Sequence, residues 1–182
     1  MRLTAIVIAL AALIIGVDAR QPTAPAADDG YHLFLLVGQS NMAGRGHVEP
    51  QDRVPIPRVL MLDRSRRWVP AVDPMHFDKP VAGVGLGRSF AAAVSQAHPE
   101  WTIGLVPAAV GGSPIDAWRP GVFYKATNSH PWDDAIARVT AARTSGRVAA
   151  ILWHQGESDA TPELAPGYEA KLHDLIARLR TA

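Results

Sequence analysis

The sequence predicts an α/β fold in which a parallel sheet of about four to five strands lies between two layers of helices. Short apolar runs of strand length alternate with segments that have helical spacing, and this order is typical of parallel sheets covered on both faces. The predicted strands are Leu33–Val37, Arg58–Asp63, Trp101–Pro107 and Val148–Trp153, and the predicted helices are Arg88–Ala97, Pro131–Thr144 and Tyr168–Arg180.

The first apolar run, Leu33–Val37, is unbroken and ends at Gly38, as expected of a strand buried on both faces. The polar residues Gln39, Ser40 and Asn41 follow it directly. In open α/β sheets ligands bind at the carboxyl ends of the strands, so the Ser40 hydroxyl is expected at an edge where a ligand would bind. The alternative is a polar turn in which Ser40 caps a helix.

Known glycine motifs do not fit this turn. The spacing of its glycines matches neither a Walker loop nor a dinucleotide fingerprint, which leaves little support for a nucleotide-dependent enzyme. A nucleophile elbow fails as well, because Met42 stands where its second glycine should be.

The second strand lies in the proline-rich segment 48–80, whose remainder we expect to be an ordered loop over the top of the sheet. This loop contains Trp68, His76 and Phe77, and it is either a substrate wall or surface cover. The glycines of Gly83–Gly87 come before the first predicted helix, where close packing or a turn explains them better than phosphate binding.

The third and fourth runs also end in residues that suit a catalytic site. Gly111 and Gly112 follow Trp101–Pro107, and adjacent glycines either leave backbone N–H groups open to an oxyanion or make a sharp turn. Gln155 follows Val148–Trp153 and carries a neutral amide that can donate to an oxyanion without forming an ion pair.

The last two predicted helices rest on local signals. Pro131 stands at a first helical position, and Asp133 and Asp134 lie in the first turn of that helix. The final helix has apolar residues at positions 172, 175, 176 and 179, which is helical spacing.

Composition bounds the class of protein. The 182 residues suggest one domain, and 48% hydrophobic with 19% charged residues is typical of a soluble globular chain. A net charge of +1 with no basic run gives no support for nucleic-acid binding. The chain has no cysteine, which excludes disulfides and thiolate chemistry and removes the soft ligands of zinc sites. We expect no cofactor and no metal.

The amino-terminal residues resemble a secretory signal peptide. Arg2 precedes the apolar run Leu3–Val17, and Val17-Asp18-Ala19 resembles a cleavage site. We expect residues 1–19 to be removed after Ala19 and residues 20–30 to form a flexible leader. Residues 31–182 would then form a secreted or periplasmic domain without stable membrane insertion, an uncleaved anchor being the alternative.

Three segments together resemble the conserved blocks of the sialate O-acetylesterase-like carbohydrate esterases, a branch of the SGNH (GDSL-type) hydrolases. They are GQSNMAG at 38–44, VPAAVGGSPIDAW at 106–118 and WHQGESDA at 153–160. The resemblance implies a flavodoxin-like sheet and removal of acetyl groups from an acetylated carbohydrate, of the sialic acid or plant polysaccharide type, through an acyl-enzyme.

The resemblance also implies roles for single residues. Ser40 would be the nucleophile, and the backbone N–H groups of Ser40 and Gly112 with the amide of Gln155 would bind the oxyanion. Other roles stay open on the residues alone: Glu157 and Asp159 could each orient Gln155, bind sugar hydroxyls or cap the following segment, and Trp118 could stack on a sugar or fill the core. The candidate substrate-binding residues are Gln39, Asn41, Trp118, His154 and Glu157.

The family's base and its orienting acid lie in a carboxyl-terminal Asp-x-x-His block that is absent here. We therefore expect either that the chain is truncated, without its last strand and that block, or that an internal histidine replaces the base. His154 is the first candidate, and His47 and His76 stay open. A catalytically impaired carbohydrate-binding or scaffold protein is the alternative function, and the oligomeric state is not predicted.

Overall fold

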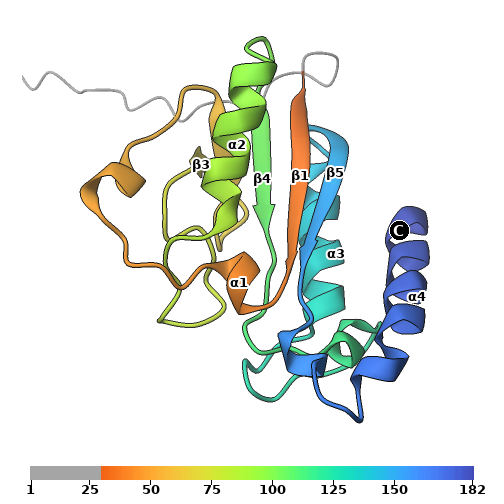
Figure 1. The fold of residues 1–182 in the computed structure, drawn as a ribbon. Helices are drawn as coiled ribbons and strands as arrows, with labels where there is room; N and C mark the ends of the chain where they lie inside the picture. The colour runs from red at the N-terminus through yellow and green to blue at the C-terminus, as the bar shows by residue number, and fades with distance from the viewer. Residues whose placement is uncertain (1–29) are drawn as a thin grey trace, which may run out of the picture.

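The computed structural model describes residues 30–182, which form a five-stranded sheet in the order β3-β2-β4-β1-β5 (Figure 1). β1, β2, β4 and β5 are parallel, and β3 runs antiparallel to β2 at one edge. The predicted α/β class is confirmed. The strands are β1 (Tyr31–Gly38), β2 (Val59–Leu62), β3 (Trp68–Pro70), β4 (Ile103–Pro107) and β5 (Gly146–His154).

Helices cover both faces of the sheet, as predicted (Figure 1). Two apolar clusters fill the two interfaces: one joins β1 to α3 and α4, and the other joins β1 and β4 to α1 and α2. The helices are α1 (Ser40–Ala43), α2 (Leu86–Ala97), α3 (Pro131–Ala142) and α4 (Tyr168–Thr181), with short 3-10 turns at Pro50–Arg53, Ile115–Trp118, Glu157–Asp159 and Ala165–Gly167.

β1 lies between β4 and β5 and is buried along almost its whole length. Its Leu36 pairs with Pro107 of β4 on one side, and its Gly38 pairs with His154 of β5 on the other. Three strands therefore end together at one edge of the sheet. The residues after each strand begin from neighbouring positions, as the predicted site requires.

Gly38 is the tightest point of this arrangement. Its φ is +132°, and a Cβ at this position would lie 2.1 Å from the carbonyl oxygen of His154. The next residue, Gln39, donates its backbone N–H to that same oxygen at 2.9 Å. Only glycine lets β1 and β5 stay paired up to the turn that presents Ser40.

The expectation that Trp68 belongs to a loop over the top of the sheet is wrong. Trp68 begins β3, and its side chain reaches to where β1 and β5 begin: the indole N–H donates to Ser145 Oγ at 3.0 Å. The ring also meets Tyr31 edge-on, with 4.8 Å between centroids. A strand of three residues that ends in proline is too short for the periodicity to reveal.

β5 is more exposed than its apolar sequence suggests. It is an edge strand of the described sheet, and several of its residues are exposed, including Val148. Within residues 30–182, no helix is both long enough and apolar enough to cross a membrane. The predicted signal peptide and most of the predicted leader lie outside the described residues.

Replacing Gly38 by alanine should destabilise the fold strongly. We expect Gly38→Ala to lower the free energy of unfolding by at least ~3 kcal/mol, because the new methyl group overlaps backbone atoms of β5. Gly121→Ala is the matched control: Gly121 also has positive φ, but no atom lies within 4 Å of its Cβ position. Urea denaturation should show a loss of only ~1 kcal/mol there, and equal losses would contradict the packing role of Gly38.

Candidate active site

The structure brings Ser40, Gly112 and Gln155 to the same edge of the sheet. Ser40 begins α1 after β1, Gly112 follows β4 and Gln155 follows β5. Hydrogen bonds hold these segments together: Val110 N–H donates to Gly38 O at 2.9 Å, and Gln155 Nε2 donates to Ser113 O at 3.1 Å. The three sequence-predicted catalytic residues therefore belong to one connected site.

Ser40 is half-buried at the first position of α1. The capping alternative is wrong, because Gln39 is the N-cap residue and no side-chain capping bond is present. Within residues 30–182, the Ser40 hydroxyl and its backbone N–H make no hydrogen bond to protein. Both groups are free to meet a ligand.

Gly112 has a φ of +81°, in the left-handed region that favours glycine. Its carbonyl oxygen accepts hydrogen bonds from the Tyr124 hydroxyl at 2.7 Å and from Ser158 Oγ at 3.0 Å. Its N–H has no acceptor among the described residues. The sharp turn and the open N–H, which the sequence left as alternatives, occur together.

Gln155 is held on every side. Its Nε2 lies 2.6 Å from Asp159 Oδ2, 3.1 Å from Ser113 O and 3.2 Å from Gln39 Oε1. A primary amide has two hydrogens, so these three acceptors already compete for them. The oxyanion role of Gln155 stays a prediction, and it requires a hydrogen that one of these acceptors now takes.

Two further residues fix the orientation of this amide. Asp159 is buried and also accepts the backbone N–H of Ile115 at 2.9 Å, so of its three possible roles the structure supports the orienting one. Tyr168, which the sequence did not reveal, places its hydroxyl 2.9 Å from Gln155 Oε1. Burial raises the pKa of Tyr168, which keeps the hydroxyl protonated and able to donate. No local sequence signal marks Tyr168, because it acts from the start of another element.

The candidate substrate-binding residues divide into buried and exposed groups. Gln39 is only 3% exposed, and its Oε1 faces Gln155 and the backbone N–H of Ser158, so it is a scaffold residue rather than a surface for sugar. Asn41 and Glu157 are exposed and form a hydrogen bond from Nδ2 to Oε1 across the β1 and β5 turns. This pair remains available to a ligand.

Trp118 fills the core. It is 1% exposed, its indole N–H donates to Ser113 Oγ at 2.9 Å, and its ring meets Trp153 edge-on. The interpretation of Trp118 as a platform for a sugar ring is therefore wrong, because no face of the indole is open. The core alternative holds.

The three candidate histidines differ in accessibility. His154 and His47 are exposed, and the backbone of His154 pairs with Gly38. His76 is buried, and its Nδ1 accepts the backbone N–H of Ala109 at 3.3 Å. Burial lowers the pKa of His76 to about 4, so its imidazole is neutral at pH 7.

Asp78 organises the loop before Gly112, a role that the sequence did not indicate. Its buried Oδ2 accepts the backbone N–H of Gly111 at 2.8 Å and pairs with Arg45 at 2.7 Å. This carboxylate ties the segment after α1 to the segment after β4. The resulting connection stabilises the position of the neighbouring Gly112.

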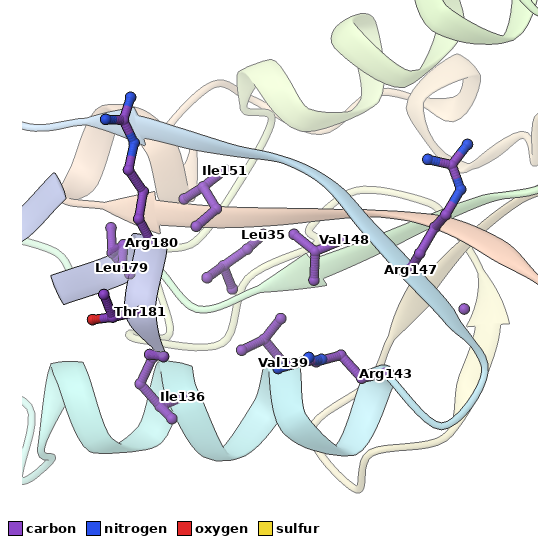
Figure 2. A pocket seen from close by; sticks show the side chains of 12 residues that line it. Leu35, Ile136, Val139, Arg143, Arg147, Val148, Ile151, Leu179, Arg180 and Thr181 are labelled. Atoms are coloured by element: carbon purple, nitrogen blue, oxygen red, sulfur yellow. The ribbon is translucent and has the colours of Figure 1, made fainter. Parts of the chain in front are cut away.

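Two of the hollows on the surface of the described residues bear on the site. One, of about 720 Å³, lies along β5 between α3 and the end of α4; Figure 2 shows Leu35, Ile136, Val139 and Ile151 around it. It contains none of the predicted catalytic residues. The other, of about 280 Å³, lies where β4 ends. Within residues 30–182, no group of three or more histidines and carboxylates could hold a metal ion.

Comparison with known proteins agrees with this sheet and its strand-end turns. The profile of a family described as carbohydrate esterase, sialic acid-specific acetylesterase, matches residues 30–182. The chain belongs to this family of carbohydrate esterases. A probable carbohydrate esterase of Arabidopsis thaliana is 36% identical in an alignment 169 positions long, which covers 81% of this chain and 62% of that protein. The chain thus spans less than two thirds of the length of that relative.

Solved structures support the fold. The crystal structure of an Arabidopsis thaliana protein superposes with a TM-score of 0.74 at 35% identity, covering 84% of this chain and 69% of that one. NanS gives 0.62 at 21% identity, over 84% of this chain and 63% of its own. A carbohydrate acetylesterase from Xanthomonas citri gives 0.59 at 21% identity, over 82% and 38% of the two chains.

His76 should make the free energy of unfolding depend on pH in the acid range. Its folded pKa of about 4 lies below the ordinary value of 6.5, so between these values the unfolded chain binds the proton more tightly. The stabilisation is complete above pH 6.5 and is lost as the pH falls towards 4. We expect His76→Gln to show a shallower decline in unfolding free energy over this window by urea titration. An unchanged slope would contradict the buried neutral state of His76.

Proposed function

We propose that this chain is a serine esterase that removes O-acetyl groups from carbohydrate. Family membership supports the reaction class. The observation that carries the proposal concerns the turns that follow the adjacent strands β1 and β4. Within residues 30–182, each turn has a backbone N–H without a hydrogen-bond partner, at Ser40 and at Gly112, and the Ser40 hydroxyl is unpartnered as well. Two such donors next to a hydroxyl can stabilise the oxyanion of a tetrahedral intermediate.

The chemistry follows the usual course of acyl transfer. Ser40 Oγ attacks the acetyl carbonyl and gives its proton to a base, and the N–H groups of Ser40 and Gly112 stabilise the oxyanion. The sugar oxygen leaves with a proton, and an acetyl ester remains on Ser40. Water then attacks this ester with the help of the same base, and acetate and the free serine are released.

We propose His154 as the base supplied by the described residues. Its side chain is exposed at the end of β5, and its backbone pairs with Gly38, two residues before Ser40. His76 is a poor alternative, because it is buried and its Nδ1 is already an acceptor for Ala109. The proposed substrates are acetylated sugars of the sialic acid or plant polysaccharide type, met outside the cytoplasm if the predicted signal peptide is used.

Carbohydrate binding without turnover is the second candidate function. It is favoured by the amide of Gln155, whose two hydrogens face Asp159, Ser113 and Gln39 rather than open space. In this case the site would hold an acetylated sugar, with Asn41 and Glu157 as exposed polar contacts.

Measuring acetate release distinguishes esterase activity from carbohydrate binding without turnover. We expect the chain to hydrolyse an aryl acetate and an acetylated sugar, and Ser40→Ala to reduce the rate by at least ~100-fold through loss of the nucleophile. Ser65→Ala is the control, since Ser65 is exposed in the turn between β2 and β3. If His154 is the base, the His154→Ala variant should lose acetate release as the Ser40→Ala variant does.

Two outcomes would contradict the esterase proposal. One is turnover that Ser40→Ala leaves unchanged. The other is absence of turnover together with binding of the acetylated sugar, detected by NMR titration and retained in Ser40→Ala, which would establish the binding function.

A further inference from the structure

The loop of residues 108–112, which follows β4, is held from two sides. Its successive backbone N–H groups turn alternately to two different supports. The first support is the backbone of β1: Ala108 donates to Leu36 O and Val110 donates to Gly38 O, both at 2.9 Å. We call this segment the oxyanion loop, because the last of its N–H groups is a proposed oxyanion donor.

The second support is a pair of side chains from one short segment before α2. Ala109 N–H donates to His76 Nδ1 at 3.3 Å, and Gly111 N–H donates to Asp78 Oδ2 at 2.8 Å. The two donors and the two acceptors are each two residues apart, so the spacing of the two segments matches. Among the described residues, the N–H of Gly112 is the first in this series that has no acceptor.

Both side-chain acceptors lie in the interior. His76 is 5% exposed, and the side chain of Asp78 is 1% exposed. Burial lowers the pKa of His76 to about 4, so the ring is neutral at pH 7 and can accept at Nδ1. Arg138 and Arg45 also favour the neutral ring, whereas Asp78 opposes them. A buried N–H that loses its acceptor is costly, so removing either side chain would favour a different path of the loop.

Asp78 also connects the oxyanion loop to the helix of the candidate nucleophile. Its Oδ2 pairs with Arg45 at 2.7 Å, and Arg45 Nη1 donates to Gly44 O at 2.6 Å in the turn after α1. One carboxylate therefore holds both the end of the helix that Ser40 begins and the residue before Gly112. The candidate nucleophile and a candidate oxyanion donor share one support.

We propose that His76 and Asp78 are positioning residues for acetyl transfer, because by holding Ala109 and Gly111 they set the position of the Gly112 N–H. This inference rests on the proposed function, in which that N–H binds the oxyanion. Oxyanion donors act only at hydrogen-bond distance from the developing charge, and a displacement of about 1 Å can cost on the order of 100-fold in rate. His76 thus holds the backbone and takes no proton from the nucleophile.

Two substitutions of His76 separate its acceptor from its volume. Asparagine carries an oxygen on Cγ, where histidine carries Nδ1, whereas leucine fills a similar volume without an acceptor. We expect His76→Leu to lower kcat for an aryl acetate by at least ~10-fold and to change KM by less than ~3-fold, because only the transition state needs the placed N–H. His76→Asn should keep kcat within ~3-fold of the unsubstituted chain, because it restores the acceptor.

Two further variants complete the kinetic test. Asp78→Ala removes the other acceptor and should lower kcat as His76→Leu does, which keeps the test decisive if a buried leucine at position 76 prevents folding. Ala135→Gly is the control for lost stability, because Ala135 is buried inside α3 and glycine within a helix destabilises the fold without removing an acceptor. Its kcat should equal that of the unsubstituted chain.

Amide hydrogen exchange, followed by NMR, tests the support of the loop without turnover. The Gly111 N–H is bonded to Asp78 and not to His76, so its exchange rate reports whether the whole loop loosens when His76 is replaced. We expect His76→Leu to accelerate this exchange by at least ~10-fold, and by more than Ala135→Gly does.

Three results would overturn the proposal: an unchanged kcat in both His76→Leu and Asp78→Ala, an equal loss of kcat in His76→Asn and His76→Leu, or Gly111 exchange no faster in His76→Leu than in Ala135→Gly. Absence of turnover in the unsubstituted chain would instead contradict the proposed function. The exchange rates would then decide by themselves whether His76 holds the loop.

Discussion

The parallel pairing of β1 with β4 on one side and β5 on the other is the constraint on which the site depends. The register aligns Leu36 with Pro107 and Gly38 with His154, so three chain segments leave the sheet together. Gly38 permits this alignment, because any side chain there would overlap β5. A shift of either neighbour along β1 would separate Ser40 from Gly112 or from Gln155.

A polar network then holds the turns after the strands. Gln155 contacts Gln39, Ser113, Asp159 and Tyr168, and these four partners come from four different parts of the chain. Asp78 performs a similar task between Arg45 and Gly111. Buried polar groups are costly unless they are paired, so these networks favour one arrangement of the loops over others. Among the described residues, the backbone N–H groups of Ser40 and Gly112 have no acceptor within this framework.

The fold was largely predictable because its strands and helices carry strong local patterns. Unbroken apolar runs mark β1, β4 and β5, and Pro131 with its following acids marks α3. The short β3 has no such pattern, and Trp68 was therefore placed in a loop. Within the site, Trp118 and Gln39 were predicted to contact substrate, but the structure buries both side chains in the interior. Single-sequence patterns do not show which polar or aromatic side chains become buried.

The residues that sequence could not reveal act across long separations. Tyr168 supports Gln155 from the start of α4, and Arg64 of the β2–β3 turn and Arg138 of α3 both lie over the Phe77 ring. Their positions follow from tertiary packing, which single-sequence patterns do not encode. The three motif segments, by contrast, lie at strand ends, where topology alone predicts that they meet.

The central claim is that the ends of β1 and β4 form a nucleophile with its oxyanion site. The most direct test is a crystal structure of the chain after reaction with diethyl p-nitrophenyl phosphate, whose phosphoryl group imitates the tetrahedral intermediate. The account predicts a covalent adduct on Ser40 Oγ, with a phosphoryl oxygen within hydrogen-bond distance of the Ser40 and Gly112 N–H groups. An unmodified Ser40, or an adduct whose oxygens all face solvent, would contradict it.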